Sequence, residues 1–321
     1  MKPLLLAIAL GAALSGTASA QSWPTKAVNI VVPYPPGGFT DVVARAIALQ
    51  LQPLIGQAVV VENKTGASGR IGLEQVLRAA PDGHTIGLVV PALLSLLPIT
   101  DEKYGDLAKQ YTPITIAVET YFGFAVNPEK TKAATFQDFV KSPRAQNKEL
   151  FYSTPGIGTS YQFWSEAILS EAGLTATHVP QRGEAPATSE LMNGQVDFTL
   201  VTGAGKGFAE AGKIKVLAVS APKGWDIYSG APSLGDVGMK QSVAAGWLGF
   251  AGPAGMPKEL TEKVNAAFVK AMQHPDVVKL LNNQGYTVVA SAPDKIAPTV
   301  AREQEIFGRL IKSGRVKLEQ N

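Results

Sequence analysis

The fold is decided by residues 27–63, which read AVNIVVPYPPGGFTDVVARAIALQLQPLIGQAVVVEN. A β-branched run at 27–32 is followed by a turn rich in proline and glycine, a helical pattern at 41–55 and a second β-branched run at 59–63. This order of strand, helix and strand predicts an α/β fold with a parallel sheet and helices on both faces.

The same alternation continues outward along the chain. A helical pattern at 70–80, a strand at 85–90 and a short helix at 93–97 complete a first unit. A second unit of similar size has strands at 150–153, 177–180, 196–201 and 215–220, with helices at 160–172 and 185–193. After a stretch rich in glycine and proline at 222–255, two long helical patterns follow at 258–283 and 293–313, with a short strand at 287–290 between them.

These patterns predict two lobes. The last two helical patterns cannot form a domain alone, so we expect them to return to the first lobe. The first lobe is then discontinuous and comprises 21–122 and 249–321, and the second lobe comprises 123–248. Two chain crossings, near 122–125 and 247–250, would form the hinge.

The N-terminus has the pattern of a secretory signal peptide over residues 1–20, MKPLLLAIALGAALSGTASA. Lys2 precedes an apolar run at 4–14, and Ala18-Ser19-Ala20 predicts cleavage before Gln21. A membrane anchor is the alternative, but this run is too short to cross about 30 Å of hydrocarbon. We therefore expect an exported, periplasmic protein.

Composition excludes several classes of site. The chain has no cysteine, which excludes disulfides, thiolate metal sites and a lipid-modified N-terminal cysteine. The formal net charge is +3, and the basic residues are scattered, so nucleic acid is not an expected partner. The three histidines are far apart in sequence, and no metal site is expected.

The sharpest local feature is the turn at 32–41, VPYPPGGFTD, where two glycines precede a helix. The backbone N–H groups at a helix start have no partner within the helix, and they favour a carboxylate or phosphate. The alternative is an ordinary strand-to-helix turn in which Thr40 is the N-cap.

A second turn at 153–160, STPGIGTS, has the same character. Thr159 and Gln162 are spaced as a capping box, and Gly173 supplies the helix stop. Each turn follows the carboxyl end of a strand, where open α/β sheets bind ligands. Two such helix starts facing one cleft would hold an anion between them.

Other motifs in the sequence offer different kinds of site. Arg182 follows a strand and could bind a carboxylate through two parallel hydrogen bonds, the alternative being a solvated loop arginine. Gly156-Ile157-Gly158 is not a dinucleotide fingerprint, because Tyr161 occupies its third glycine position. Gly205-Lys206 is not a P-loop, because Leu200 and Gly207 replace required residues. No cofactor motif and no G-x-S-x-G elbow is present.

The sequence from Trp23 to Leu88 resembles the tripartite tricarboxylate transporter substrate-binding proteins, the Bug-type receptors. The likeness continues through STPGIGTS, HVPQRGEAPATSELMNGQVDF, AGKIKVLAVS and GWLGFAGPAGMPKELTEKVNAAFVKAM, in order, over nearly the whole chain after residue 22.

The resemblance implies a Venus-flytrap fold of the type II periplasmic binding protein class, with no enzymatic activity. It implies a small carboxylate ligand, permease subunits of a tripartite tricarboxylate transporter as membrane partners, and a monomer. Asp41 would mainly orient its own loop. The ligand-binding residues carried over to this sequence, together with Arg182, are Tyr34, Gly37, Gly38, Phe39, Thr40, Asp41, Pro91, Ala92, Thr154, Gly158, Thr159 and Ser160.

The sequence departs from the family pattern at Phe39, Ile157 and Arg182. The acidic residue that many relatives carry after the strand at 196–201 is also missing, since Val201 and Thr202 occupy that region. The ammonium group of an amino acid would lack its carboxylate partner, so we expect a carboxylate ligand without an amino group. An aliphatic or aromatic dicarboxylate, or another aromatic acid, would fit this expectation. The alternative functions are ligand sensing for a membrane histidine kinase and, as a third reading, an enzyme acting on a carboxylate.

Overall fold

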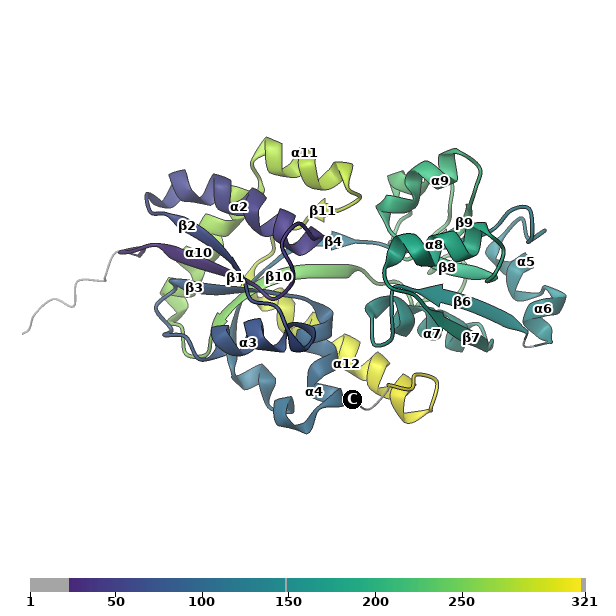
Figure 1. The fold of residues 1–321 in the computed structure, drawn as a ribbon, viewed down its shortest axis with the longest axis horizontal. Coiled ribbons are helices and arrows are strands. Elements are labelled where there is room, and N and C mark those ends of the chain that lie inside the picture. Colours follow the sequence, from purple (N-terminus) through teal and green to yellow (C-terminus); the bar gives the residue numbers. More distant parts are fainter. Residues whose placement is uncertain (1–22, 148, 319–321) are drawn as a thin grey trace, which may run out of the picture.

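The computed structural model describes residues 23–147 and 149–318, and in it the chain forms two lobes side by side (Figure 1). Each lobe is built on one sheet with helices on both faces. The predicted two-lobed α/β fold is confirmed. The predicted signal peptide at 1–20 lies outside the described residues.

The first lobe contains a six-stranded sheet in the order β11-β4-β10-β3-β1-β2. β1 pairs in parallel with β2 and β3, and β10 pairs antiparallel with β3 and β4. The parallel strands place their carboxyl ends at one edge of the sheet, where the first glycine turn begins. The strands are β1 (Val28–Val32), β2 (Val59–Asn63), β3 (Thr85–Val89), β4 (Tyr111–Thr120), β10 (Gly246–Pro253) and β11 (Thr287–Val288).

Helices cover both faces of this sheet. One face packs on α2 (Phe39–Ile55), α10 (Lys258–Met272) and α11 (Pro275–Asn283). The other packs on α3 (Arg70–Leu77), α4 (Leu97–Thr100) and the first half of α12 (Ile296–Lys312). The helical pattern predicted at 258–283 divides into two helices because Pro275 cannot continue α10 and instead starts α11.

The second lobe contains a five-stranded sheet in the order β7-β6-β8-β5-β9. β6 is parallel to both β7 and β8, so these three strands also end at one edge. The strands are β5 (Gly123–Val126), β6 (Leu150–Thr154), β7 (Ala176–Pro180), β8 (Phe198–Val201) and β9 (Lys215–Val219). The helices are α5 (Phe136–Val140), α6 (Pro143–Gln146), α7 (Ser160–Glu171), α8 (Glu184–Met192) and α9 (Lys206–Glu210).

Two chain crossings join the lobes and lie next to each other. β4 passes directly into β5, and the chain returns from β9 into β10, where Gly246 pairs with Thr120. Ser220 ties the crossings together, because its Oγ accepts from Phe122 N at 2.9 Å and donates to Ala244 O at 2.6 Å. The hinge is therefore a pair of hydrogen-bonded segments.

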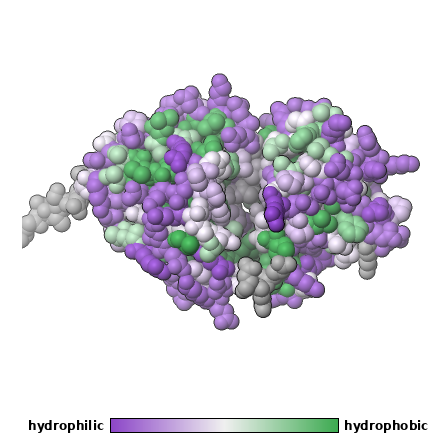
Figure 2. Space-filling view, in the orientation of Figure 1, coloured by the Kyte–Doolittle hydropathy of each residue, from purple (hydrophilic) through white to green (hydrophobic). Residues whose placement is uncertain are grey.

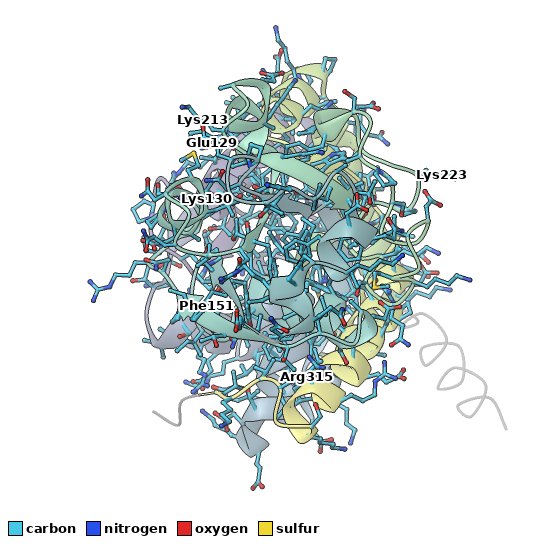
Figure 3. The ribbon with its side chains drawn as sticks, turned by 90° about the vertical axis from the view of Figure 1, so that its right-hand side faces the viewer. Glu129, Lys130, Phe151, Lys213, Lys223 and Arg315 are labelled. Carbon is cyan, nitrogen blue, oxygen red and sulfur yellow. The ribbon has the colours of Figure 1, made fainter. Side chains whose placement is uncertain are left out.

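The C-terminal helix differs from its predicted place. The sequence pattern predicts that all of 249–321 belongs to the first lobe, but the second half of α12 packs into the core of the second lobe. Phe307 lies 4.7 Å from Phe163 and 5.2 Å from Trp164, measured between ring centroids. Beyond the helix, Arg315 lies against the second lobe and donates to Leu174 O at 3.1 Å (Figure 3). The buried aromatic face of α7 needs this apolar cover, so α12 spans both lobes.

Candidate functional site

The first glycine turn connects β1 to α2. Gly37 has a φ of +80°, a left-handed conformation that favours glycine. The N-cap of α2 is Gly38, which has no side chain to cap the helix, and Thr40 already lies in the first turn. Among the described residues, the N–H groups of Phe39 and Thr40 have no acceptor. The alternative with Thr40 as N-cap is wrong, and the start of α2 offers bare backbone donors.

Asp41 holds this turn in place. Its carboxylate is buried and accepts from Gly37 N at 2.9 Å, Arg45 Nε at 2.9 Å and Asn63 Nδ2 at 3.0 Å. Asn63 Nδ2 also donates to Tyr34 O, so the network reaches both ends of the turn. The hydrogen bond from Arg45 lowers the pKa of Asp41 to about 2, and those from Gly37 and Asn63 act in the same direction. Because the Asp41 carboxylate accepts all three hydrogen bonds from its own lobe, it orients the first glycine turn.

The second glycine turn connects β6 to α7. Gly158 has a φ of +72°, and its N–H donates to Gln162 Oε1 at 2.8 Å. The predicted capping box is wrong, because Thr159 is the N-cap but its hydroxyl donates to Gly156 O at 2.8 Å. Among the residues described, no acceptor meets the N–H of Ser160. As in the first lobe, the helix start keeps free donors. Gly173, in the left-handed conformation at +69°, follows the helix end as predicted.

Thr154, at the end of β6, faces inward. Its side chain is fully buried, and its hydroxyl lies 2.6 Å from His178 Nε2. Burial lowers the pKa of His178 to about 4, so this ring is neutral at physiological pH. Thr154 therefore supports the turn from beneath.

The two helix starts border the same space between the lobes, which is visible as a hollow in the surface (Figure 2). Phe39, in the first turn of α2, stacks on Tyr286 with ring centroids 3.5 Å apart. Gly285, next to Tyr286, lies against the backbone of Gly203 in the second lobe. Burial and the Glu184 carboxylate of that lobe both raise the pKa of the Tyr286 hydroxyl. Tyr161, in the first turn of α7, donates to Glu184 Oε2 at 2.7 Å. This series of contacts connects one helix start to the other.

The remaining predicted residues lie around these turns. Tyr34 is half-buried, and burial raises the pKa of its hydroxyl to about 12. Pro91 is buried and Ala92 half-buried after β3, which ends beside β1 at the same sheet edge. Arg182 is exposed on the loop after β7, whose neighbours Gln181 and Gly183 donate to backbone oxygens of 154 and 155. The Arg182 loop thus lies beside the second glycine turn.

Sequence reasoning missed Glu184 as a member of the site. From the sequence, no carboxylate is expected beside Thr202, but Glu184 Oε1 accepts from Thr202 N at 2.7 Å. Glu184 thus places a carboxylate beside Thr202, where the sequence alone indicated none. The available signal was an acidic residue directly after Gly183, at the start of a helix at the carboxyl end of a parallel strand.

Within residues 23–147 and 149–318, no group of three or more His, Cys, Asp or Glu side chains could hold a metal ion. No helix in the same ranges is long and apolar enough to cross a bilayer.

Comparison with known proteins agrees with this architecture. Residues 43–315 match the sequence model of the tripartite tricarboxylate transporter family receptor. BugT of Bordetella pertussis is 27% identical over 99% of this chain and 99% of its own length. An R. palustris protein solved with adipate is 27% identical, with a TM-score of 0.73 over 92% of this chain and 99% of its own. MatC from Rhodopseudomonas palustris with bound malate is 25% identical, with a TM-score of 0.71 over 90% of this chain and 100% of its own.

Proposed function

Because this chain belongs to the tripartite tricarboxylate transporter family receptors, we propose that it captures a small organic carboxylate between its lobes and delivers it to the permease of such a transporter. The family comprises periplasmic solute-binding proteins, and the resemblance found in the sequence is thereby confirmed. The proposal concerns the ligand class, the residues that hold it and the membrane partner.

The observation that carries the proposal is the pair of uncapped helix starts at one interlobe space. Gly38 cannot cap α2, and the Thr159 hydroxyl is turned away toward Gly156. Both helices are long enough to present free N–H groups with the positive end of a macrodipole behind them. A carboxylate held by both starts would neutralise two such ends at once.

The relatives solved with adipate and malate support an acid as the ligand. In this chain we place the ligand carboxylate at the N–H groups of 38–40 and 159–161, with Arg182 at the rim. Asp41 and Thr154 then act as positioning residues, because both are buried and fully hydrogen-bonded inside their lobes. A ligand that contacts both lobes stabilises the closed arrangement through its higher affinity for that state.

The test is a thermal-shift screen of the protein without residues 1–20 against aliphatic dicarboxylates, aromatic acids, amino acids and sugars. A ligand that binds only the native state raises the melting temperature, so stabilisation by carboxylates alone is the expected result. Stabilisation by sugars alone, or by none of these compounds, would refute the proposal.

A Gly38→Asp variant tests the location of the anion. An aspartate at the N-cap supplies its own carboxylate to the free N–H groups of α2, which stabilises the helix but blocks an incoming anion. The extended backbone of Gly38, with a φ of −74°, accepts this residue. The matched control is Pro257→Asp at the uncapped start of α10, remote from the hinge at the far end of β10. Unchanged carboxylate affinity in Gly38→Asp would show that α2 does not hold the ligand.

A further inference from the structure

Glu184 places a carboxylate in the space between the lobes. It begins α8 and is half-buried, and its oxygens accept hydrogen bonds only from the second lobe among the described residues. Thr202 donates from its backbone N at 2.7 Å and from its hydroxyl at 2.8 Å, and Tyr161 donates at 2.7 Å. The site that we assign to an anion therefore already contains a negative charge.

The donors leave Glu184 incompletely satisfied. A carboxylate has about four acceptor positions, and three hydrogens approach those of Glu184. They come from Thr202 N, from Tyr161 and from the Thr202 hydroxyl, which lies 2.8 Å from Oε1 and 3.0 Å from Oε2 and shares its one hydrogen between them. The Thr202 carbonyl is in turn held by the Tyr228 hydroxyl, which fixes the whole group. Across the gap stands Tyr286 of the first lobe, close enough for Glu184 to raise the pKa of its hydroxyl. The remaining acceptor position is thus available to a molecule that enters between the lobes.

We propose that Glu184 is a specificity determinant that selects carboxylate ligands which also bear a hydrogen-bond donor, an ammonium, a neutral amino or a hydroxyl group, and that it disfavours unsubstituted acids. This inference rests on the proposed function and specifies its ligand class. The ligand carboxylate binds at the helix starts, and its donor group fills the free acceptor position of Glu184.

The physical reason is the sign of the charge. An acid without a donor brings a second negative charge near Glu184 with nothing to offset the repulsion, and desolvation during closure strengthens that repulsion. An ammonium group converts it into an attraction, whereas a hydroxyl group supplies a hydrogen bond to a charged acceptor. The interaction of Glu184 with an ammonium group is more favourable than its hydrogen bond with a hydroxyl group. Within one carbon skeleton, the expected affinity is therefore highest for the amino acid, lower for the hydroxy acid and lowest for the unsubstituted acid.

Glu184 also has a structural role, since it ties α8 to the end of β8, and the test must separate the two roles. Glu184→Gln keeps the size of the side chain and one acceptor oxygen for Thr202 N, but it removes the charge. The matched control is Glu129→Gln, which makes the same change at an exposed residue on the outer end of the second lobe (Figure 3). Far-ultraviolet circular dichroism and the melting temperature establish that both variants fold.

The experiment is isothermal titration calorimetry with matched acids of one skeleton: succinate, malate and aspartate, then adipate and 2-aminoadipate, then benzoate with its 4-hydroxy and 4-amino derivatives. Among the acids that share the carbon skeleton which the protein binds, we expect a donor-bearing acid to have the highest affinity. In Glu184→Gln its affinity falls about tenfold or more, as for loss of a hydrogen bond to a charged group. The unsubstituted acid gains affinity in the same variant, and Glu129→Gln matches the unmodified protein with every acid.

Two other outcomes are distinguishable. If an unsubstituted acid binds at least as tightly as its donor-bearing derivatives, and Glu184→Gln leaves that order unchanged, the role of Glu184 is refuted while the carboxylate receptor stands. If no acid of any skeleton binds, the proposed function itself fails, and this inference fails with it.

Discussion

Replacement of Asp41 by asparagine tests whether this buried carboxylate holds the first glycine turn. The side chain is 3% exposed, and its three hydrogen bonds lower its pKa from the ordinary 3.8 to about 2. At about 1.4 kcal/mol for each tenfold change in proton affinity, this lowering corresponds to about 2 kcal/mol of folding free energy at neutral pH. The free energy of unfolding of Asp41→Asn should be lower by about that amount. The reason is that Gly37 N and Arg45 Nε both donate to one charged carboxylate oxygen of Asp41, which an uncharged amide cannot replace.

The dependence on pH has a definite sign. Since the pKa of Asp41 is lower in the folded than in the unfolded protein, its stabilisation is complete above about pH 4 and is lost as the pH falls toward about 2. The free energies of unfolding of both proteins, measured by urea denaturation, should therefore differ at pH 7 and converge as the pH approaches about 2. The control is Asp106→Asn, since Asp106 is exposed and, within the part of the chain that the structure describes, pairs only with Lys109. Equal stability at pH 7, or a difference independent of pH, would refute the reasoning.

Three further perturbations address the hinge and the bridging helix. Phe307→Ala, at a fully buried ring, should lower the free energy of unfolding by about 3–5 kcal/mol in urea denaturation, and a loss under about 1 kcal/mol would show that α12 is not part of the second core. Gly203→Val should hold the lobes apart, because a Cβ at this position would overlap the backbone of Gly285. Small-angle scattering with ligand should show less compaction of this variant than of Gly207→Ala, where the added side chain meets open space. Equal compaction of the two variants would contradict the contact between Gly203 and Gly285. Burial raises the pKa of Glu303 to about 7, so charging it costs folding free energy as the pH rises from about 5 to 8. Glu303→Gln should be more stable than the unmodified protein at pH 8, by on the order of 3 kcal/mol, with the difference vanishing near pH 5; a constant difference between these pH values would exclude the carboxyl group as its cause.

Within the site, short-range patterns predicted the elements better than the roles of single side chains. The two glycine turns and the helices after them lie where the sequence places them, because proline, glycine and β-branched runs act over a few residues. The capping interactions were not predictable in this way. Thr159 and Gln162 have the spacing of a capping box, but the turn between β6 and α7 directs both side chains to its own backbone.

The strands at the hinge were harder to recognise than those of the parallel units. β4 contains Pro113, which argues against a strand in the interior of a sheet. The structure accommodates it through a register shift, in which Phe250 pairs with Thr115 and Ala251 with Pro113. Only the partner strand, more than 130 residues away, reveals this bulge.

The sequence by itself determined the alternation of strands and helices, the division into two α/β units and the two glycine-flanked helix starts, because each depends on residues close together in the chain. The tertiary structure decided which distant groups meet. It brings Glu184 to Thr202 at the space between the lobes, and it brings Glu303 of α12 to Ser95 and Trp247 at the hinge. It also lays α12 across both cores. No local pattern encodes these contacts, since they arise when apolar faces far apart in sequence are buried against each other and carry their polar neighbours with them.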